Sequence, residues 1–395
     1  MYIKRREFLK MGSLVSASMM LPNFLKALET DNSLQNRPNI LFVLQLTGGN
    51  DGLNTIIPIR NDIYFRERSQ IGIKNSLRLN DEAGINPNLG FFKKLYEQGE
   101  LAVLNNVGYP NPDKSHFRSM DIWHSASRSD EYLETGWLGR YLDEACYDCP
   151  HPTQALEVDD MLSLALKGKN NKAFAFKEPR KLYQLSQENY LKTLAQQHDH
   201  EEETVSYLYS TLGSTINNAD YIFDKSKTKA TADSYPNSGL GKEFKTISSL
   251  IKSDINTRVY YLSIGSFDTH VNQNDRQGKL FQEINEAVKA FVADLKKHDL
   301  FKNVLLMTFS EFGRRVAQNA SNGTDHGTAN QLFFISGGLK KQGMLNALPD
   351  LKNLHEGDLI YTEDFRKVYA TVLKNWLQAD SNKILGWKDG LYDFV

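Results

Sequence analysis

Two pairs of acidic and imidazole residues lie beside apolar runs of this chain. Asp268 and His270 stand two apart after one run, and Asp325 and His326 are adjacent just before another. Residues two apart in an extended segment point to the same side, so Asp268 and His270 can reach one cation. Imidazole nitrogens and carboxylate oxygens are ligands that Zn²⁺ takes in proteins. Either pair alone has an ordinary structural explanation, but together they predict a site for a divalent cation.

Two further carboxylates follow apolar runs in the same way. Asp51 comes after the first run, among the glycines of segment 48–54, and Glu311 comes after the fourth, with two arginines behind it. A simple Asn-Asp-Gly turn would also explain the segment around Asp51. If the runs are strands of one sheet, several carboxylate and imidazole groups meet at one edge. Such a coincidence strengthens the metal-site hypothesis.

A hydroxyl group stands at the expected start of a helix. Ser115 precedes a segment of helical pattern that runs through Trp123, and its side chain suits an N-cap. The same position lies in the positive potential of a helix N-terminus, which would stabilise an alkoxide and an incoming anion. The sequence leaves both roles open, capping and catalysis. His116 and Arg118 lie close enough along the chain to supply a proton relay or an anion clamp.

Five apolar runs predict the strands that position these groups. Helical spacing separates several of them, first over 89–98 and later over 280–295. Strands that alternate with helices specify an α/β fold, in which a mostly parallel central sheet is flanked by helices. Functional groups in such sheets lie beyond the carboxyl ends of the strands. The predicted strands are 39–46, 102–107, 258–264, 303–309 and 331–336.

One large domain accounts for residues 38–395, because no linker rich in Pro or Ser divides them. The stretch of about 181–253 is polar with helical periodicity, which predicts an inserted helical region. His198 and His200 lie there in a run of charges, and their spacing on a helix sends them to different faces, which disfavours a metal site. Near the end of the chain, Thr362 is a candidate N-cap of a packing helix.

The charge balance and composition exclude some partners. Lys and Arg number 47 against 48 Asp and Glu, a formal charge of −1, so no global field would draw in nucleic acid or an anionic membrane. Apolar content of 40% indicates a substantial core, and no segment after the N-terminus is apolar enough to span a bilayer. The two cysteines of the chain, Cys146 and Cys149, form either a small disulfide loop or two free thiols.

The N-terminal residues resemble a twin-arginine export signal. Arg5 and Arg6 stand in the segment Lys-Arg-Arg-Glu-Phe-Leu-Lys, and an apolar run over 11–21 follows. Roughly ten uncharged residues are too few to cross a hydrocarbon core of about 30 Å as a stable helix, so residues 1–30 are excluded from the fold. The resemblance implies a periplasmic or otherwise exported protein that meets the twin-arginine export machinery.

Five motifs, in order, resemble those of an exported family of unassigned function that carries twin-arginine signals. That family belongs to the alkaline phosphatase and sulfatase superfamily, and the resemblance runs from about residue 39 to the C-terminus. It implies an alkaline phosphatase-like fold and a bound divalent metal, zinc above all, with one or two ions. The motifs are Gly48-Gly49-Asn50-Asp51-Gly52, Ser115-His116-Phe117, Phe267-Asp268-Thr269-His270, Ser310-Glu311-Phe312-Gly313-Arg314 and Thr324-Asp325-His326-Gly327.

The resemblance also implies a role for matched residues. Ser115 would be the nucleophile, and Asp51 would be an early ligand. Asp268 and His270 would bind one metal together with His326, their partner from late in the chain.

The chain departs from the superfamily pattern beside Glu311. This residue falls where the superfamily carries a ligating aspartate of the central strand, and Phe312 follows it where phosphatases carry a histidine of the second metal. The departure weakens the case for a second tightly held zinc. Asp325 would either ligate the metal or orient His326 from behind.

The sequence disfavours a sulfatase that depends on formylglycine. That modification needs Pro two residues and Arg four residues after the modified position, whereas Phe117 and Ser119 follow Ser115. The leading hypothesis is an exported metal-dependent hydrolase of phosphate or sulfate esters of a small molecule or glycan. The alternative is a non-catalytic envelope protein that uses a degenerate fold for binding or assembly, and Phe312 favours it.

Overall fold

The computed structural model describes residues 38–145, 153–170, 173–189, 193, 216, 218–227, 234–253 and 255–395. Three sequence predictions lie outside these residues. They concern the export signal over 1–30, the pair Cys146 and Cys149, and the histidines His198 and His200. The chain divides into two units, 1–39 and 40–395, and the fold is that of the second.

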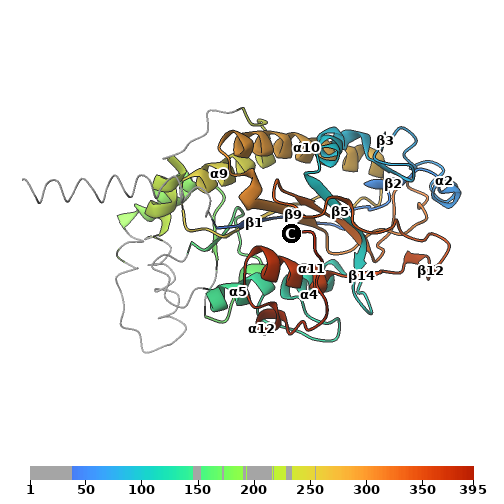
Figure 1. Cartoon of the computed structure of the whole chain (residues 1–395). Coiled ribbons are helices and arrows are strands. Elements are labelled where there is room, and N and C mark those ends of the chain that lie inside the picture. Colours follow the sequence, from blue (N-terminus) through green and yellow to red (C-terminus); the bar gives the residue numbers. More distant parts are fainter. Residues whose placement is uncertain are drawn as a thin grey trace, which may run out of the picture. The chain divides into compact units, whose positions relative to one another are not determined.

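The main sheet has nine strands within the described residues, in the order β11-β5-β10-β9-β1-β8-β6-β7, with β14 paired to β5 (Figure 1). All five predicted strands are confirmed to within one residue at each end. The strands are β1 (Ile40–Leu46), β5 (Leu101–Gly108), β6 (Ala155–Glu157), β7 (Phe174–Ala175), β8 (Val259–Ile264), β9 (Val304–Phe309), β10 (Asn330–Ile335), β11 (Gly343–Met344) and β14 (Glu363–Asp364). Two small sheets contain β2 (Ile56–Pro58), β3 (Leu77–Arg78) and β4 (Ala83–Ile85), and β12 (Leu354–His355) and β13 (Asp358–Leu359).

The sheet is mostly parallel, as predicted, with one strand reversed. β1 pairs in parallel with both β8 and β9, and β6 pairs in parallel with β8. β10 runs antiparallel to both of its neighbours, β5 and β9. Its reversed direction brings the residues that precede β10 to the edge where β1, β5, β8 and β9 end. Polar groups before one strand and after four others therefore share one edge.

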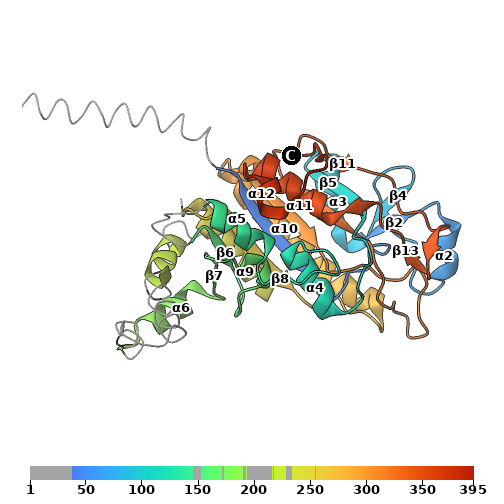
Figure 2. The ribbon, with the colours of Figure 1, turned by 90° about the horizontal axis from the view of Figure 1, so that it is seen from below.

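The helices cover both faces of the sheet (Figures 1 and 2). α3, α9 and α10 contribute to the core on one face, and α4, α5 and α11 contribute to the core on the other. The helices are α2 (Asp62–Glu67), α3 (Gly90–Glu97), α4 (His116–Ser125), α5 (Trp137–Ala145), α6 (Pro179–Ser186), α9 (Gly239–Lys252), α10 (Gln273–Lys297), α11 (Phe365–Thr371) and α12 (Ser381–Leu385). Short turns of other helix types are η2 (Pro87–Leu89), η3 (Leu164–Leu166), η4 (Phe301–Asn303) and the π-helical η5 (Val372–Trp376).

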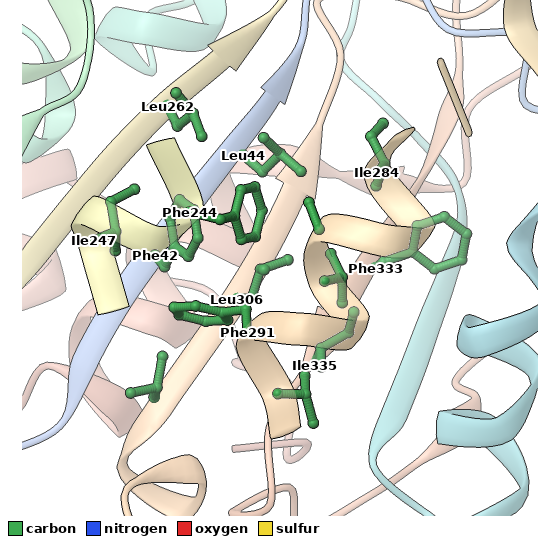
Figure 3. Packing of buried hydrophobic residues seen from close by; sticks show 14 of the residues in the cluster. Phe42, Leu44, Phe244, Ile247, Leu262, Ile284, Phe291, Leu306, Phe333 and Ile335 are labelled. Atoms are coloured by element: carbon green, nitrogen blue, oxygen red, sulfur yellow. The ribbon is translucent and has the colours of Figure 1, made fainter. Parts of the chain in front are cut away.

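The central strand β1 is apolar on both faces because each face meets a helical layer. Phe42 lies in the core beneath α9 and α10, where its ring centroid is 5.0 Å from that of Phe244 and 5.4 Å from that of Phe291 (Figure 3). Its neighbours Leu41 and Val43 lie in the opposite core. This packing fixes the strand whose end leads into the candidate site.

The region predicted as a helical insertion contains α6 and α9. Phe244 and Ile247 of α9 lie fully buried in the sheet core, so this helix belongs to the layer that covers the sheet. Among the described residues, the chain forms no helix that is both long and apolar enough to cross a membrane.

The cap of the last packing helix differs from the prediction. Asp364 is the N-cap of α11, and its carboxylate accepts a hydrogen bond from the backbone N–H of Arg366 at 2.9 Å. Thr362 cannot cap it because residues 363–364 are still extended and pair with β5 as β14. The strand contact delays the start of the helix by two residues.

Candidate metal centre

Two segments at the polar edge of the sheet hold the candidate ligands in register. After β8, Asp268 and His270 alternate with the buried residues Phe267 and Thr269, so both side chains leave the same side of an extended segment, as predicted. The backbone N–H of Phe267 donates to Thr47 O at 3.1 Å and ties this segment to the end of β1.

The second segment follows β9 and lies against the residues before β10. Arg314 and His326 form an antiparallel bridge. Beside it, the backbone N–H of Arg315 donates to Asp325 O at 3.0 Å. The reversed direction of β10 thus places His326 next to the end of β9.

Three donor atoms of the predicted ligands form a tight triangle. Asp268 Oδ1 lies 3.1 Å from His270 Nε2 and 3.3 Å from His326 Nε2, and the two Nε2 atoms are 3.0 Å apart. The structure therefore brings together the three residues that the sequence analysis selected for the principal metal.

The Nδ1 atom of each imidazole near Asp268 is held by an acceptor. His326 Nδ1 donates to the backbone carbonyl of Lys114 at 2.8 Å, and His270 Nδ1 donates to Asp325 Oδ1 at 3.3 Å. An acceptor oxygen requires the ring proton on Nδ1, so a neutral ring then presents a lone pair on Nε2. Two lone pairs 3.0 Å apart repel each other unless a proton or a metal cation lies between them.

His116 joins this cluster from the start of α4. Its Nε2 atom lies 3.6 Å from Asp268 Oδ2, and His116, Asp268 and His326 each offer a ligand atom within 4.8 Å of the others. Its Nδ1 atom donates to Glu311 Oε1 at 2.9 Å. The sequence analysis expected a proton relay at His116, but its position is that of a further candidate ligand.

Glu311 lies behind His116 instead of facing the cluster. Its side chain is fully buried, and Oε1 also accepts the backbone N–H of Gly48 at 2.8 Å. Ser310 Oγ donates to Oε2 at 3.3 Å. The carboxylate can orient the ring of His116 and fix its tautomer, which is the arrangement of carboxylate and imidazole common behind metal ligands.

Arg314 supports Asp268 from beneath. Its buried guanidinium donates to Asp268 Oδ1 at 2.6 Å, to Gly49 O at 2.6 Å and to Thr324 O at 3.0 Å. Burial raises the pKa of Asp268, but the hydrogen bond and charge of Arg314 outweigh this and leave it below its ordinary value. The carboxylate is thus held ionised. Arg314 itself is buried behind it and does not face a substrate.

The imidazole and acidic groups around Asp268 have different proton affinities. The hydrogen bond that His116 donates to Glu311 raises the pKa of His116, whereas burial lowers the pKa of His326. The hydrogen bond from Asn319 lowers the pKa of Asp325. A neutral ring at His326 keeps its Nε2 lone pair available to a cation.

The donor set fits a zinc ion on distance and chemistry. Four ligands of a tetrahedral Zn²⁺ with bonds of about 2.0 Å would lie roughly 3.3 Å apart. The separations of 3.0, 3.1 and 3.3 Å within the triangle lie close to this value. His116 Nε2 lies 3.6 Å from the other carboxylate oxygen, Asp268 Oδ2. The donor set also suits zinc, which accepts imidazole nitrogen together with carboxylate oxygen. Magnesium and calcium favour oxygen ligands alone.

Asp51 is not among the residues brought together. Its Oδ2 atom accepts from Arg68 Nη1 at 2.6 Å and from Gln273, and its Oδ1 atom accepts from the backbone N–H of Leu53 at 3.0 Å. The side chains of Asp51 and Arg68 are both fully buried. Hydrogen-bond donors of the protein occupy both carboxylate oxygens. Asp51 thus forms a buried ion pair with Arg68 and stabilises the turn that follows it.

Ser115 is the N-cap residue of α4 and is exposed. Its side chain accepts no capping hydrogen bond from the helix, and its backbone N–H donates to Asp113 Oδ1 at 2.7 Å. Its chain neighbours, Lys114 and His116, both contact the cluster. The hydroxyl of Ser115 therefore does not cap the helix, although the residue stands at the N-cap position.

Arg118 lies away from the cluster. Its guanidinium donates to the carbonyls of Ser129 at 2.9 Å and Glu131 at 2.5 Å, and lies 3.8 Å from the ring centroid of Tyr132. It holds the segment 128–132, and the structure does not place it as an anion clamp beside His116.

Phe312 occupies the position that the superfamily resemblance gives to a second-metal histidine. Its buried ring lies 4.9 Å from the ring of His116 and 4.6 Å from that of His326, measured between centroids. An apolar wall thus stands beside both imidazoles.

Two supporting groups were missed from the sequence. The carbonyl of Lys114 is a backbone atom, so no residue type could indicate it. Asn319 donates to His270 O at 3.0 Å and to Asp325 Oδ1 at 3.3 Å, but a single Asn in a loop carries no spacing signal. Glu311 was selected from the sequence because it follows a predicted strand. That position suits a metal ligand as well as a residue that orients a ligand, so the sequence could not separate the two roles.

Comparison with solved structures finds matches at low sequence identity and with TM-scores below 0.5. The sulfatase PsFucS1 from Pseudoalteromonas sp. is 13% identical, with 93% of this chain and 72% of that chain covered and a TM-score of 0.39. A protein in the alkaline phosphatase superfamily from Vibrio parahaemolyticus is 11% identical, with 90% and 71% covered and a TM-score of 0.39. The phosphonate monoester hydrolase SpPMH from Silicibacter pomeroyi is 6% identical, with 90% and 78% covered and a TM-score of 0.41.

Comparison of sequences gives the family. No curated protein matches the chain in sequence. The family described as "Protein of unknown function (DUF1501)" matches residues 38–377, which include every strand of the main sheet and every residue of the candidate metal centre. The chain therefore belongs to the DUF1501 family.

Proposed function

We propose that this chain is an exported, metal-dependent hydrolase of phosphate or sulfate esters. The substrate would be an ester of a small molecule or glycan. Support for export by the twin-arginine machinery comes from Arg5, Arg6 and the apolar run after them.

The convergence of imidazole Nε2 atoms on Asp268 carries the proposal. Three rings have their Nδ1 atoms fixed by Glu311, Lys114 O and Asp325, and their Nε2 atoms within 3.6 Å of the Asp268 carboxylate. A purely structural cluster has no need to aim several lone pairs at one carboxylate. His116, Asp268, His270 and His326 would hold the cation.

We assign the attack on the ester to Ser115. The Ser115 oxygen forms a bond to phosphorus or sulfur while the bond to the alcohol breaks, and the hydroxyl proton passes to the departing alcohol. Water then releases the inorganic anion and restores the serine. The N-terminus of α4 favours the anionic group at this position. When bound, the cation would stabilise negative charge on the ester and on the attacking oxygen.

The second candidate is a non-catalytic envelope protein that keeps a metal ion and uses the fold for binding or assembly. The apolar ring of Phe312 beside His116 and His326 favours it, because a second cation would lack a ligand there. Both candidates predict bound metal, so only turnover separates them.

The test measures metal and turnover together. Protein purified without chelator is analysed for metal and assayed with 4-nitrophenyl phosphate, bis-4-nitrophenyl phosphate and 4-nitrophenyl sulfate. Ser115→Ala should lower kcat by at least about 10³-fold, because the nucleophile is lost, while metal content stays unchanged.

Ser69→Ala serves as the matched control, since Ser69 is also exposed but lies in a turn after α2. Its kcat should equal that of the unmodified protein. Equal turnover in Ser115→Ala would remove Ser115 from the mechanism, and metal without turnover of any ester would favour the binding protein.

A further inference from the structure

A cavity lies beside the candidate metal centre. It has a volume of about 390 Å³ and lies between the segment after β5 and the segment that carries β12 and β13. Its lining includes Tyr109, Lys114, Thr328, Ile360 and Tyr361. The volume falls within the roughly 300–1,000 Å³ typical of small-molecule pockets. None of the roles described so far uses it.

The cavity shares its wall with the metal centre. Lys114 lines the cavity, and its backbone carbonyl accepts the Nδ1 proton of His326 at 2.8 Å. Thr328 lines it two residues after His326. The residue after Lys114 is Ser115, so an ester held at that hydroxyl lies one residue from the cavity wall.

The lysine in the wall is paired with a carboxylate, so the cavity is not a second anion site. The ammonium group of Lys114 pairs with the buried Asp358 Oδ2, and Arg315 Nε lies 3.4 Å from Asp358 Oδ1. Arg315 Nη2 also donates to the backbone carbonyl of Glu356 at 2.8 Å, and the Glu356 carboxylate adds a negative charge to the lining. A phosphate or sulfate would meet no unpaired cation among these residues.

The rest of the wall combines apolar and aromatic residues with the polar residues Asn111, Thr328 and His355. Ile360 leaves 42% of its surface exposed, although its backbone carbonyl is held by Asn106 Nδ2 at 2.6 Å. Two tyrosines also line the cavity, Tyr361, which is half-buried, and Tyr109, which is buried. Exposed apolar surface inside a concave site without an unpaired lysine or arginine is typical of a pocket for an uncharged ring.

From these features we infer that the cavity binds the uncharged ring of the ester's alcohol part while the anionic group lies at the metal centre. The inference rests on the proposed function for the position of the anion. It names the substrate class: an anionic ester whose organic group is an uncharged ring with an apolar face.

The experiment measures binding, which requires no turnover. Phenylphosphonate and methylphosphonate, with benzenesulfonate and methanesulfonate as the matching sulfonates, are titrated by calorimetry into the metal-containing protein. Each pair keeps the anionic group and differs only in the ring. The ring compound of the pair that binds should be about tenfold tighter, as expected for one apolar group in a matching pocket.

Ile360→Asp should remove most of this tenfold preference, because it places a charge where the ring would pack. Leu185→Asp is the control, since Leu185 is an exposed apolar residue of α6, outside the cavity. The control should keep the full preference. Thermal melting of both variants checks that they are folded, and Tyr361→Ala gives a second, uncharged disruption of the same wall.

Three outcomes would overturn the inference: equal affinity for ring and methyl compounds, a preference that survives both Ile360→Asp and Tyr361→Ala, or no binding of any of the four compounds. Turnover of the 4-nitrophenyl esters is scored separately. If the protein prefers the ring compound but hydrolyses no ester, the ring pocket is supported and the hydrolase proposal is contradicted. If the protein hydrolyses an ester but shows no preference for the ring compound, the hydrolase proposal is supported and the ring pocket is contradicted.

Discussion

The carboxylate of Glu311 touches two groups that come from distant parts of the chain. Oε1 accepts from the backbone of Gly48 and from the ring of His116, and the side chain is fully buried. At the scale of single residues, the candidate site consists of groups that face the cation position and groups that hold them. His270 and His326 are held in the same way, by Asp325 and Lys114.

Glu311→Gln tests whether this residue positions His116 or ligates the metal. A positioning role predicts a loss of about 10–100-fold in metal affinity, because the amide cannot fix the imidazole as firmly. The variant should still bind one equivalent of zinc at saturation. Competition with a chromophoric chelator measures the affinity.

Glu97→Gln is the control for the charge change, since Glu97 forms an exposed pair with Lys93. A Glu311→Gln protein with unchanged zinc affinity would contradict the positioning role. Failure to bind zinc at any concentration would instead return Glu311 to the ligand set.

At the scale of elements, the sequence predicted the strands well and their directions only in part. The runs that became β1, β5, β8, β9 and β10 are apolar on both faces, so composition alone marks them. The antiparallel direction of β10 could not be predicted in this way, because the apolar composition of a buried strand does not indicate its direction. The clustering of His326 with Asp268 was nevertheless predicted, since its chemistry and motif order indicated it.

Some local features depend on partners that the sequence does not name. Asp51 carries the signal of a ligand, but the buried guanidinium of Arg68 claims its Oδ2 atom. Thr362 carries the signal of a cap, but pairing of residues 363–364 with β5 shifts the cap to Asp364. In both cases a contact between distant residues outweighs a local preference.

Gly48→Ala should damage both the fold and the metal centre. Gly48 has a φ of +118°, and an added Cβ would stand 2.4 Å from the backbone nitrogen of Asp268. The backbone strain alone costs about 1–2 kcal/mol, and the clash must also displace the segment that carries a ligand. We expect a larger loss of unfolding free energy, together with weaker zinc binding.

Gly386→Ala separates the two causes, because Gly386 has a φ of +68° and no atom near an added Cβ. It should cost only the backbone strain and leave zinc affinity unchanged. Urea unfolding and zinc titration of both variants provide the comparison. Equal losses in the two proteins would show that the contact between Gly48 and Asp268 does not constrain the site.

At the scale of the whole molecule, one buried acid outside the site couples stability to pH. Glu157 of β6 is fully buried and accepts hydrogen bonds from the backbone N–H of Ser163 at 2.6 Å and from its hydroxyl. No ion pair within the described part of the chain involves Glu157. Burial raises the pKa of Glu157, and the hydrogen bonds from Ser163 offset only part of this effect. The resulting pKa is about 7.

The protein should therefore lose stability as pH rises from about 5 to 8. Over this range the folded state keeps a proton on Glu157 that the unfolded chain, with an ordinary pKa, has released, so deprotonation favours unfolding. The raised pKa corresponds to a loss on the order of 3 kcal/mol across the range. Urea unfolding at pH 5 and pH 8 measures it.

Glu157→Gln should be less sensitive to pH over this range than the unmodified protein and more stable at pH 8, because an amide keeps both contacts to Ser163 without a charge. Glu82→Gln, at an exposed position, should retain the original dependence. A Glu157→Gln protein with the same slope as the unmodified one would assign the pH effect to other groups.

The ligand segments lie far apart along the chain. His326 contacts Lys114 across 212 residues, and His116 contacts Glu311 across 195. During synthesis, a growing polypeptide that ends before His326 would lack one of the proposed ligands. In the proposed site, capture of the ion would then be a late event, and the cation could not serve as a nucleus around which the earliest structure assembles.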